Sequence, residues 1–215
     1  MDLHEFRGRP SQIGTAYGET FKEKIDANLN ILVRRKGYEP LPENDPAFIN
    51  WVSEQEGLIK RNWAWLIEEM KGVAQGAGAE YEEILLLNLR SWQYEFYNGQ
   101  PCTECSSVAA RLDDGTIAHA GALDDGIQYY CGMIKFVPDN GNSFFCFPIT
   151  GTSWASRGVN SAGLTWGCAS QIMPGLKRYP GSMNQDIGKR IVMQTCDTVE
   201  EVRKLCGDFL FNINF

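Results

Sequence analysis

The sequence predicts an α+β fold in which helices come first and antiparallel strands follow. Apolar residues recur at helical spacing over residues 12–96, the periodicity changes to two at Cys105, and helical spacing returns near residue 184. A run of helices followed by a run of strands is typical of the α+β class. Because 43% of the 215 residues are hydrophobic, the chain can bury a substantial core and does not have a disordered composition.

The first half of the chain is predicted to be helical. One helix is expected over residues 12–35, where Gly37 follows as a stop signal. A second helical segment begins at Asp45-Pro46, because an N-cap aspartate followed by proline is typical of a helix start, and it ends at Gly76 and Gly78. A further helix is expected over residues 80–96, where the leucines are too dense for one narrow stripe and indicate burial.

Strands are predicted from Cys105 onward. Residues 105–111 alternate with a period of two, Asp113-Asp114-Gly115 supplies a turn, and residues 116–122 return as the second strand of a hairpin. Further strands, separated by turn signals, are expected over residues 129–137, 143–149 and 164–170.

Two helices are predicted near the end of the chain, over residues 184–194 and 198–205. Glu200 and Glu201 lie in the first turn of the second helix, where negative charge is favourable. The last stretch, FLFNINF, is apolar and strand-like. Since chain termini are normally polar and frayed, we expect the protein to be incomplete after Phe215.

Composition limits the classes of function. A formal net charge of −7 and the lack of a basic cluster argue against nucleic acid as a partner. The polar opening MDLHEFRGRP resembles neither a secretory signal nor a transit peptide, and no apolar run is long enough for a membrane span. The seven cysteines are odd in number and mostly have apolar neighbours, as buried thiols do. We therefore expect a reducing compartment and a cytoplasmic location.

Cys102 and Cys105 form a CxxC pattern that raises three alternatives. A structural zinc site needs two more ligands, but the chain has only two histidines and no second CxxC. A redox motif of the thioredoxin type follows a strand and opens a helix, whereas here a helix comes before and a strand after. The third alternative is a nucleophilic thiol, and the plainest interpretation of Cys105 remains a small packed strand residue.

The nucleophile hypothesis has a specific chemistry. The Cys105 thiol would attack the carbonyl of Glu104, and water would cleave the resulting thioester, so that a new chain begins with Cys105. An α-amine has a reference pKa of about 8, so it can act as the base for its own thiol without a histidine. His119 is therefore interpreted as an ordinary strand histidine.

Four motifs resemble those of one family. The stretch CSSVAARLDDGTIAHAGALDDG has a cysteine with following serines, a turn glycine and an aspartate at the end of the second strand; Cys105, Ser106, Ser107, Gly115 and Asp124 carry this pattern. IGTAYGETFKEKI, MKGVAQGAGAEYEEILLLNLR and SRGVNSAGLTWG occur around it in the same order. Together they resemble the N-terminal nucleophile (Ntn) hydrolase superfamily, in particular its isopenicillin N acyltransferase and acid ceramidase-like cysteine acyltransferases and amidohydrolases.

The resemblance implies a four-layer αββα sandwich, with two antiparallel sheets face to face and helices outside. It implies self-cleavage between Glu104 and Cys105 into a helical segment, 1–104, and a β-rich catalytic segment, 105–215, which form a self-cleaved heterodimer or receive a complementing chain. The reaction would be hydrolysis or transfer of an acyl group from a small-molecule amide or acyl-coenzyme A thioester, with no cofactor or metal. Asp124 would orient the new α-amine.

The chain also departs from the family pattern. Gly121 and Ala122 stand where an arginine and an asparagine are expected, so a charged donor near the nucleophile is missing. In the strand after the Asn-Ser-Ala-Gly turn, Ser170 is the residue left to serve an oxyanion hole, and Trp166 is a candidate for the acyl pocket. These departures leave open a second hypothesis, a catalytically silent or partial homologue that acts as a binding protein.

Overall fold

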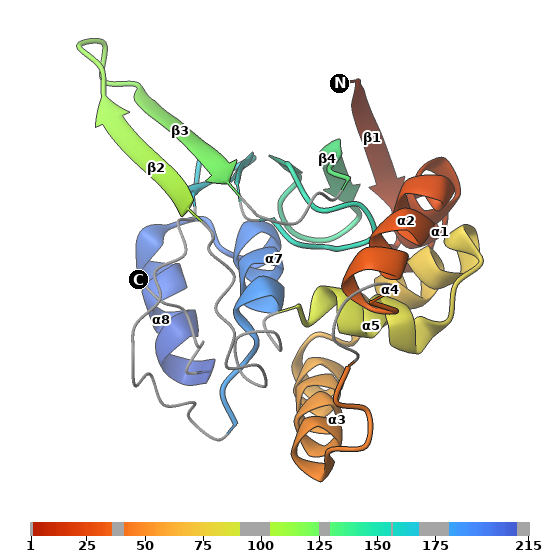
Figure 1. Ribbon diagram of the computed structural model, residues 1–215. Helices are drawn as coiled ribbons and strands as arrows, with labels where there is room; N and C mark the ends of the chain where they lie inside the picture. The colour runs from red at the N-terminus through yellow and green to blue at the C-terminus, as the bar shows by residue number, and fades with distance from the viewer. Residues whose placement is uncertain are drawn as a thin grey trace.

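The computed structural model describes residues 2–35, 41–90, 104–124, 130–155, 157–167 and 181–209. Helices pack on one face of a five-stranded sheet, and a separate two-stranded hairpin projects from the other side of the molecule (Figure 1). The α+β class predicted from the sequence is confirmed. The residues of β5 alternate between the two faces of the main sheet, because Phe144 and Cys146 are buried in the core, whereas Phe145 lines a pocket on the hairpin side.

The N-terminal half contains one strand and five helices among its described residues: β1 (Leu3–Gly8), α1 (Pro10–Thr20), α2 (Lys22–Leu32), α3 (Pro46–Asn62), α4 (Ala64–Ala77) and α5 (Tyr81–Asn88). The helix predicted over residues 12–35 is interrupted at Phe21, whose backbone is not helical. Asp45 caps α3 by accepting a hydrogen bond from the Ala47 amide at 2.8 Å. Gly78 ends α4 in the left-handed conformation, with φ of 70°.

Helices α1 and α4 approach each other through glycine. Gly14 and Gly18 on α1 face Gly72 and Gly76 on α4, each four residues apart in its helix. A methyl group at any of the four positions would overlap backbone atoms of the opposite helix; at Gly72 it would lie 2.6 Å from the Ser11 carbonyl oxygen. Gly76 therefore lies inside α4, and the prediction that it ends the helix is wrong.

The main sheet has the strand order β1-β4-β5-β6-β7, with bounds β4 (Met133–Pro138), β5 (Phe144–Cys146), β6 (Gly158–Asn160) and β7 (Thr165–Trp166). Neighbouring strands from β4 to β7 pair in antiparallel fashion, as expected. Strand β1 was missed in the sequence and pairs with β4 in parallel, with Phe6 opposite Phe136. The expectation of wholly antiparallel sheets is therefore wrong at β1, and residues 1–104 contribute a strand as well as helices.

The hairpin consists of β2 (Glu104–Arg111) and β3 (Ile117–Asp124), close to the predicted strands. Leu112 and Thr116 close the turn with a hydrogen bond of 2.8 Å, and Gly115 takes the positive φ of 85° that the turn requires. Two helices follow late in the chain, α7 (Gln185–Thr195) and α8 (Val199–Phe209), so Phe209 ends a helix. The rest of the strand predicted at the C-terminus, residues 210–215, lies outside the described residues.

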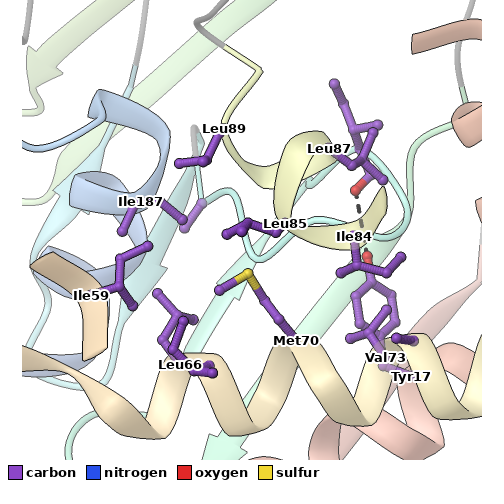
Figure 2. Packing of buried hydrophobic residues seen from close by; sticks show 14 of the residues in the cluster. Tyr17, Ile59, Leu66, Met70, Val73, Ile84, Leu85, Leu87, Leu89 and Ile187 are labelled. Atoms are coloured by element: carbon purple, nitrogen blue, oxygen red, sulfur yellow. Dashed lines mark hydrogen bonds between the residues drawn. The ribbon is translucent and has the colours of Figure 1, made fainter. Parts of the chain in front are cut away.

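The core lies between the helices and one face of the main sheet. Figure 2 shows apolar side chains from α3, α4, α5 and α7 meeting in it, among them Ile59, Leu66, Met70, Leu85 and Ile187. On the sheet, Phe144 and Cys146 are buried in this core, whereas Phe145 between them points to the other face. The alternation along β5 thus separates the core from the candidate site.

Candidate functional site

A pocket of about 690 Å³ lies between the hairpin and the outer face of the main sheet. The sheet contributes Phe145, Phe147, Val159 and Trp166, and the hairpin contributes Ser107, Ile117, His119 and Gly121. Strand pairing explains this grouping, because Phe145 lies opposite Val159, and Ser107 lies opposite Gly121. The volume is within the range of about 300–1,000 Å³ that small-molecule sites occupy.

Ser107 and His119 form a polar pair inside the pocket. The Ser107 hydroxyl oxygen lies 2.8 Å from Nε2 of His119, diagonally across the hairpin, and the tautomer of the ring decides which group donates. The imidazole lies against Gly167, where a side chain would overlap the ring. His119, interpreted from the sequence as an ordinary strand histidine, is therefore a pocket residue with a serine partner.

Arg157 places its guanidinium beside Gly121 and Ala122 of the hairpin. Its Nη2 donates a hydrogen bond to the carbonyl oxygen of Ala122 at 2.7 Å. Its Nε lies 3.2 Å from the place where a side chain at Gly121 would begin, so the absence of that side chain makes room for the guanidinium. Arg157 directly precedes β6 and lies 35 residues after Ala122 in the chain. Arg157 is the arginine of the SRGVNSAGLTWG motif, but the sequence gave no indication that it lies beside the hairpin.

Cys105 is half buried near the start of β2. By strand alternation it lies on the same face as Ser107, two residues away, which corresponds to about 6.6 Å along a strand. It does not itself line the pocket, but it adjoins the wall that Ser107 forms. In register, Cys105 pairs with Leu123, and Asp124 pairs with Glu104. The backbone therefore places Asp124 directly across from the residue whose carbonyl would be attacked.

The remaining predicted residues divide into two groups. Trp166, a candidate for an acyl pocket in the sequence analysis, is among the residues that line this pocket. Ser170 and Cys102 lie outside the described residues. Within the part of the chain that the structure describes, no group of three or more histidine, cysteine or acidic residues could hold a metal ion.

The described cysteines differ in burial, so we expect them to differ in reactivity. Burial raises the pKa of the Cys146 thiol to about 12, so at pH 8 about one molecule in ten thousand carries the reactive thiolate. Raising the pH increases that fraction but leaves the thiol sealed in the core. We expect iodoacetamide at pH 8 to modify Cys105 at least about tenfold faster than Cys146, as measured by peptide mass spectrometry. Equal rates in the native protein would contradict this, whereas in concentrated guanidinium chloride both should react alike.

Comparison with known proteins gives an informative similarity. The chain is 28% identical over 116 residues to the 40 kDa form of acyl-coenzyme A:6-aminopenicillanic-acid acyltransferase from Emericella nidulans. The matched region is 52% of this chain and 30% of that protein. No protein-family model matches the chain. The similarity supports a relationship to the isopenicillin N acyltransferase group.

None of the described helices has the length and apolar character needed to cross a bilayer.

Proposed function

We propose that the protein transfers or hydrolyses acyl groups through Cys105, which becomes an N-terminal nucleophile by self-cleavage. One observation carries the proposal: a half-exposed cysteine is the second residue of a hairpin strand, on the face that borders a 690 Å³ pocket. The similarity to an acyltransferase over half of the chain supports acyl chemistry. The predicted four-layer Ntn sandwich is part of the same proposal.

Maturation would proceed in two steps, an acyl shift to sulfur and the hydrolysis of the thioester. The Cys105 sulfur adds to the Glu104 carbonyl carbon, and the amide C–N bond breaks. The amide nitrogen takes up the proton that the thiol loses and becomes a free amine. Water then hydrolyses the thioester, which returns the thiol and leaves a carboxylate on Glu104. The products are segments 1–104 and 105–215. Asp124, in register with Glu104, would hold the new amine in place.

In the acyl reaction, the α-amine would accept the thiol proton while the thiolate attacks the substrate carbonyl. The proton then passes to the leaving amine or thiol, and water or an acceptor amine removes the acyl group from sulfur. Trp166 would pack against the acyl chain, and Ser170 would donate to the oxyanion. We propose no cofactor or metal, and the substrate would be a small-molecule amide or acyl-coenzyme A thioester.

Intact-mass measurement of the purified chain tests this function. We expect two fragments that meet between Glu104 and Cys105, whereas the Cys105→Ala variant should remain one species because it has no nucleophile. Cys206→Ala, which changes a half-buried cysteine on α8, should cleave like the unmodified chain. Incubation of the cleaved protein with octanoyl-coenzyme A should then add an octanoyl group to the peptide that contains Cys105.

An uncleaved chain that takes up no acyl group would overturn the proposal and favour the silent binding protein instead. Cleavage without acylation would retain the maturation step and exclude the thioester as donor. Bound zinc, or a reversible disulfide between Cys102 and Cys105, would support the metal or redox alternative and contradict nucleophilic chemistry at Cys105.

A further inference from the structure

The pocket holds a hydroxyl group and an imidazole in direct contact. The Ser107 hydroxyl oxygen lies 2.8 Å from Nε2 of His119, and both residues line the pocket. A serine hydroxyl is a weak nucleophile unless a base takes its proton, and such a base must lie within about 2.6–3.2 Å. The pair therefore meets the geometric condition for an activated serine. The mechanism proposed for Cys105 uses neither of these groups.

A glycine of the main sheet layer leaves room for both reacting atoms. Ser107 lies on β2, His119 lies on β3, and Gly167 directly follows β7. A methyl group at Gly167 would overlap the His119 ring and lie 2.6 Å from the Ser107 hydroxyl oxygen. The pair thus packs against the backbone at Gly167 at the place where hairpin and sheet meet. Ser107 is nevertheless exposed and His119 half-buried, so a substrate can reach the hydroxyl group.

Apolar side chains form the adjoining wall of the pocket. Phe145 and Phe147 pack edge to face with ring centroids 4.9 Å apart, and Phe145 lies directly opposite Val159. Ile117, two residues before His119 on β3, lines the same pocket and is 55% exposed. Exposed apolar side chains gathered around a concave site are a sign of a ligand that covers them. The apolar chain of an acyl group is a ligand of this kind.

We infer that Ser107 and His119 form a second nucleophilic centre, which hydrolyses carboxylic esters that carry an apolar acyl chain. With the ring proton on Nδ1, Nε2 of His119 accepts the hydroxyl proton while Oγ of Ser107 attacks the ester carbonyl carbon. The bond from this carbon to the alcohol oxygen breaks, and the imidazolium gives its proton to that oxygen. Water, deprotonated by the same imidazole, then hydrolyses the acyl-serine and restores the hydroxyl group.

Esters are the matching substrates because an alkoxide leaves more readily than an amine does. The inference goes beyond the proposed function, since it requires neither the Cys105 thiol nor self-cleavage. It is therefore tested in full-length chains that all carry Cys105→Ala, in which the thiol cannot contribute to the reaction.

Hydrolysis of p-nitrophenyl octanoate is the first measurement. In the Cys105→Ala background, we expect Ser107→Ala and His119→Gln each to lower kcat/KM at least about tenfold, because general-base catalysis contributes about 10²–10⁴-fold. Ser106→Ala is the matched control. Ser106 is the neighbouring exposed serine, and by strand alternation it points to the opposite face of β2, so its removal should leave kcat/KM unchanged.

Covalent labelling with ethyl octylfluorophosphonate is the second measurement and does not depend on turnover. The Ser107 oxygen forms a bond to phosphorus and fluoride leaves, so mass spectrometry should find one phosphonyl group on the peptide that contains Ser107. The label should be absent in Ser107→Ala, at least about tenfold slower to form in His119→Gln, and unchanged in Ser106→Ala.

Hydrolysis and labelling that persist in Ser107→Ala, or the absence of both in the Cys105→Ala background, would overturn the inference. Hydrolysis that is lost in His119→Gln but kept in Ser107→Ala would also overturn it, because the imidazole would then be the nucleophile. If His119→Gln does not fold, as judged by its thermal transition, the Ser107→Ala result decides. Serine-dependent hydrolysis by a protein that never self-cleaves would retain this inference while the proposed function fails.

Discussion

A Gly14→Ala variant should lose about 3 kcal/mol or more of its unfolding free energy, which is a large part of the stability of an ordinary domain. The added methyl group would overlap the carbonyl oxygen of Glu69 and lie 2.9 Å from the Val73 amide nitrogen, both in the backbone of α4. Backbone atoms cannot rotate away as a side chain can. The two helices must therefore separate, and the core that they cover must open with them.

Urea denaturation of Gly14→Ala and of a matched control measures this effect. Gly207 lies within α8, is exposed, and has no neighbouring atom within 4 Å of the position where a methyl group would be added. Gly207→Ala should therefore leave stability unchanged or raise it by about 0.5–1 kcal/mol, because alanine is the better helix former. A loss below about 1 kcal/mol in Gly14→Ala would show that α1 and α4 do not pack as closely as described.

The glycines also show what periodicity can and cannot predict. The sequence predicted both Gly76 and Gly78 as helix stops, but only Gly78 has a positive φ, whereas Gly76 lies against the Thr15 carbonyl. A glycine that ends a helix and a glycine that admits a neighbouring backbone have the same local pattern. Only the facing helix, more than 50 residues away, distinguishes them.

Strand β1 was missed for a related reason. In LHEFRG the side chains are mostly polar, and only Phe6 is buried, so the segment lacks the alternation of a half-buried strand. Its pairing partner β4 lies about 130 residues further along the chain. The hairpin, in contrast, was predicted closely because its alternation and its Asp-Asp-Gly turn are local signals.

The residues of the candidate site also differ in whether the sequence could predict them. Cys105 and Asp124 could be predicted because they lie in one hairpin whose two strands adjoin in the sequence. Arg157 could not, because its relation to Gly121 depends on how the main sheet and the hairpin pack together. The resemblance implied an arginine at residue 121, where this chain has glycine, and in the structure the Arg157 guanidinium lies beside that glycine.

Glu69→Ala should destabilise the protein by about 3–5 kcal/mol, because it leaves a buried charge without its partner. Oε2 of Glu69 on α4 accepts a hydrogen bond of 2.7 Å from Nη2 of Arg190 on α7, and the two side chains are 2% and 0% exposed. The Arg190 guanidinium also lies 4.5 Å from the ring centroid of Phe144 and bonds to Gln194. Without the carboxylate, this cation would remain among aromatic rings, where water cannot reach it.

Three further variants isolate the electrostatic part of this effect in urea denaturation. Glu200→Ala removes one partner of an exposed pair with Arg203 and should cost at most about 1 kcal/mol. Glu69→Gln keeps the shape and one acceptor oxygen, so its loss should lie between those of Glu69→Ala and Glu200→Ala. The double variant Glu69→Ala/Arg190→Met removes both charges and should recover part of the stability that Glu69→Ala alone loses. A double variant less stable than Glu69→Ala would mean that Arg190 stabilises α7 mainly through its contacts with the aromatic rings and Gln194.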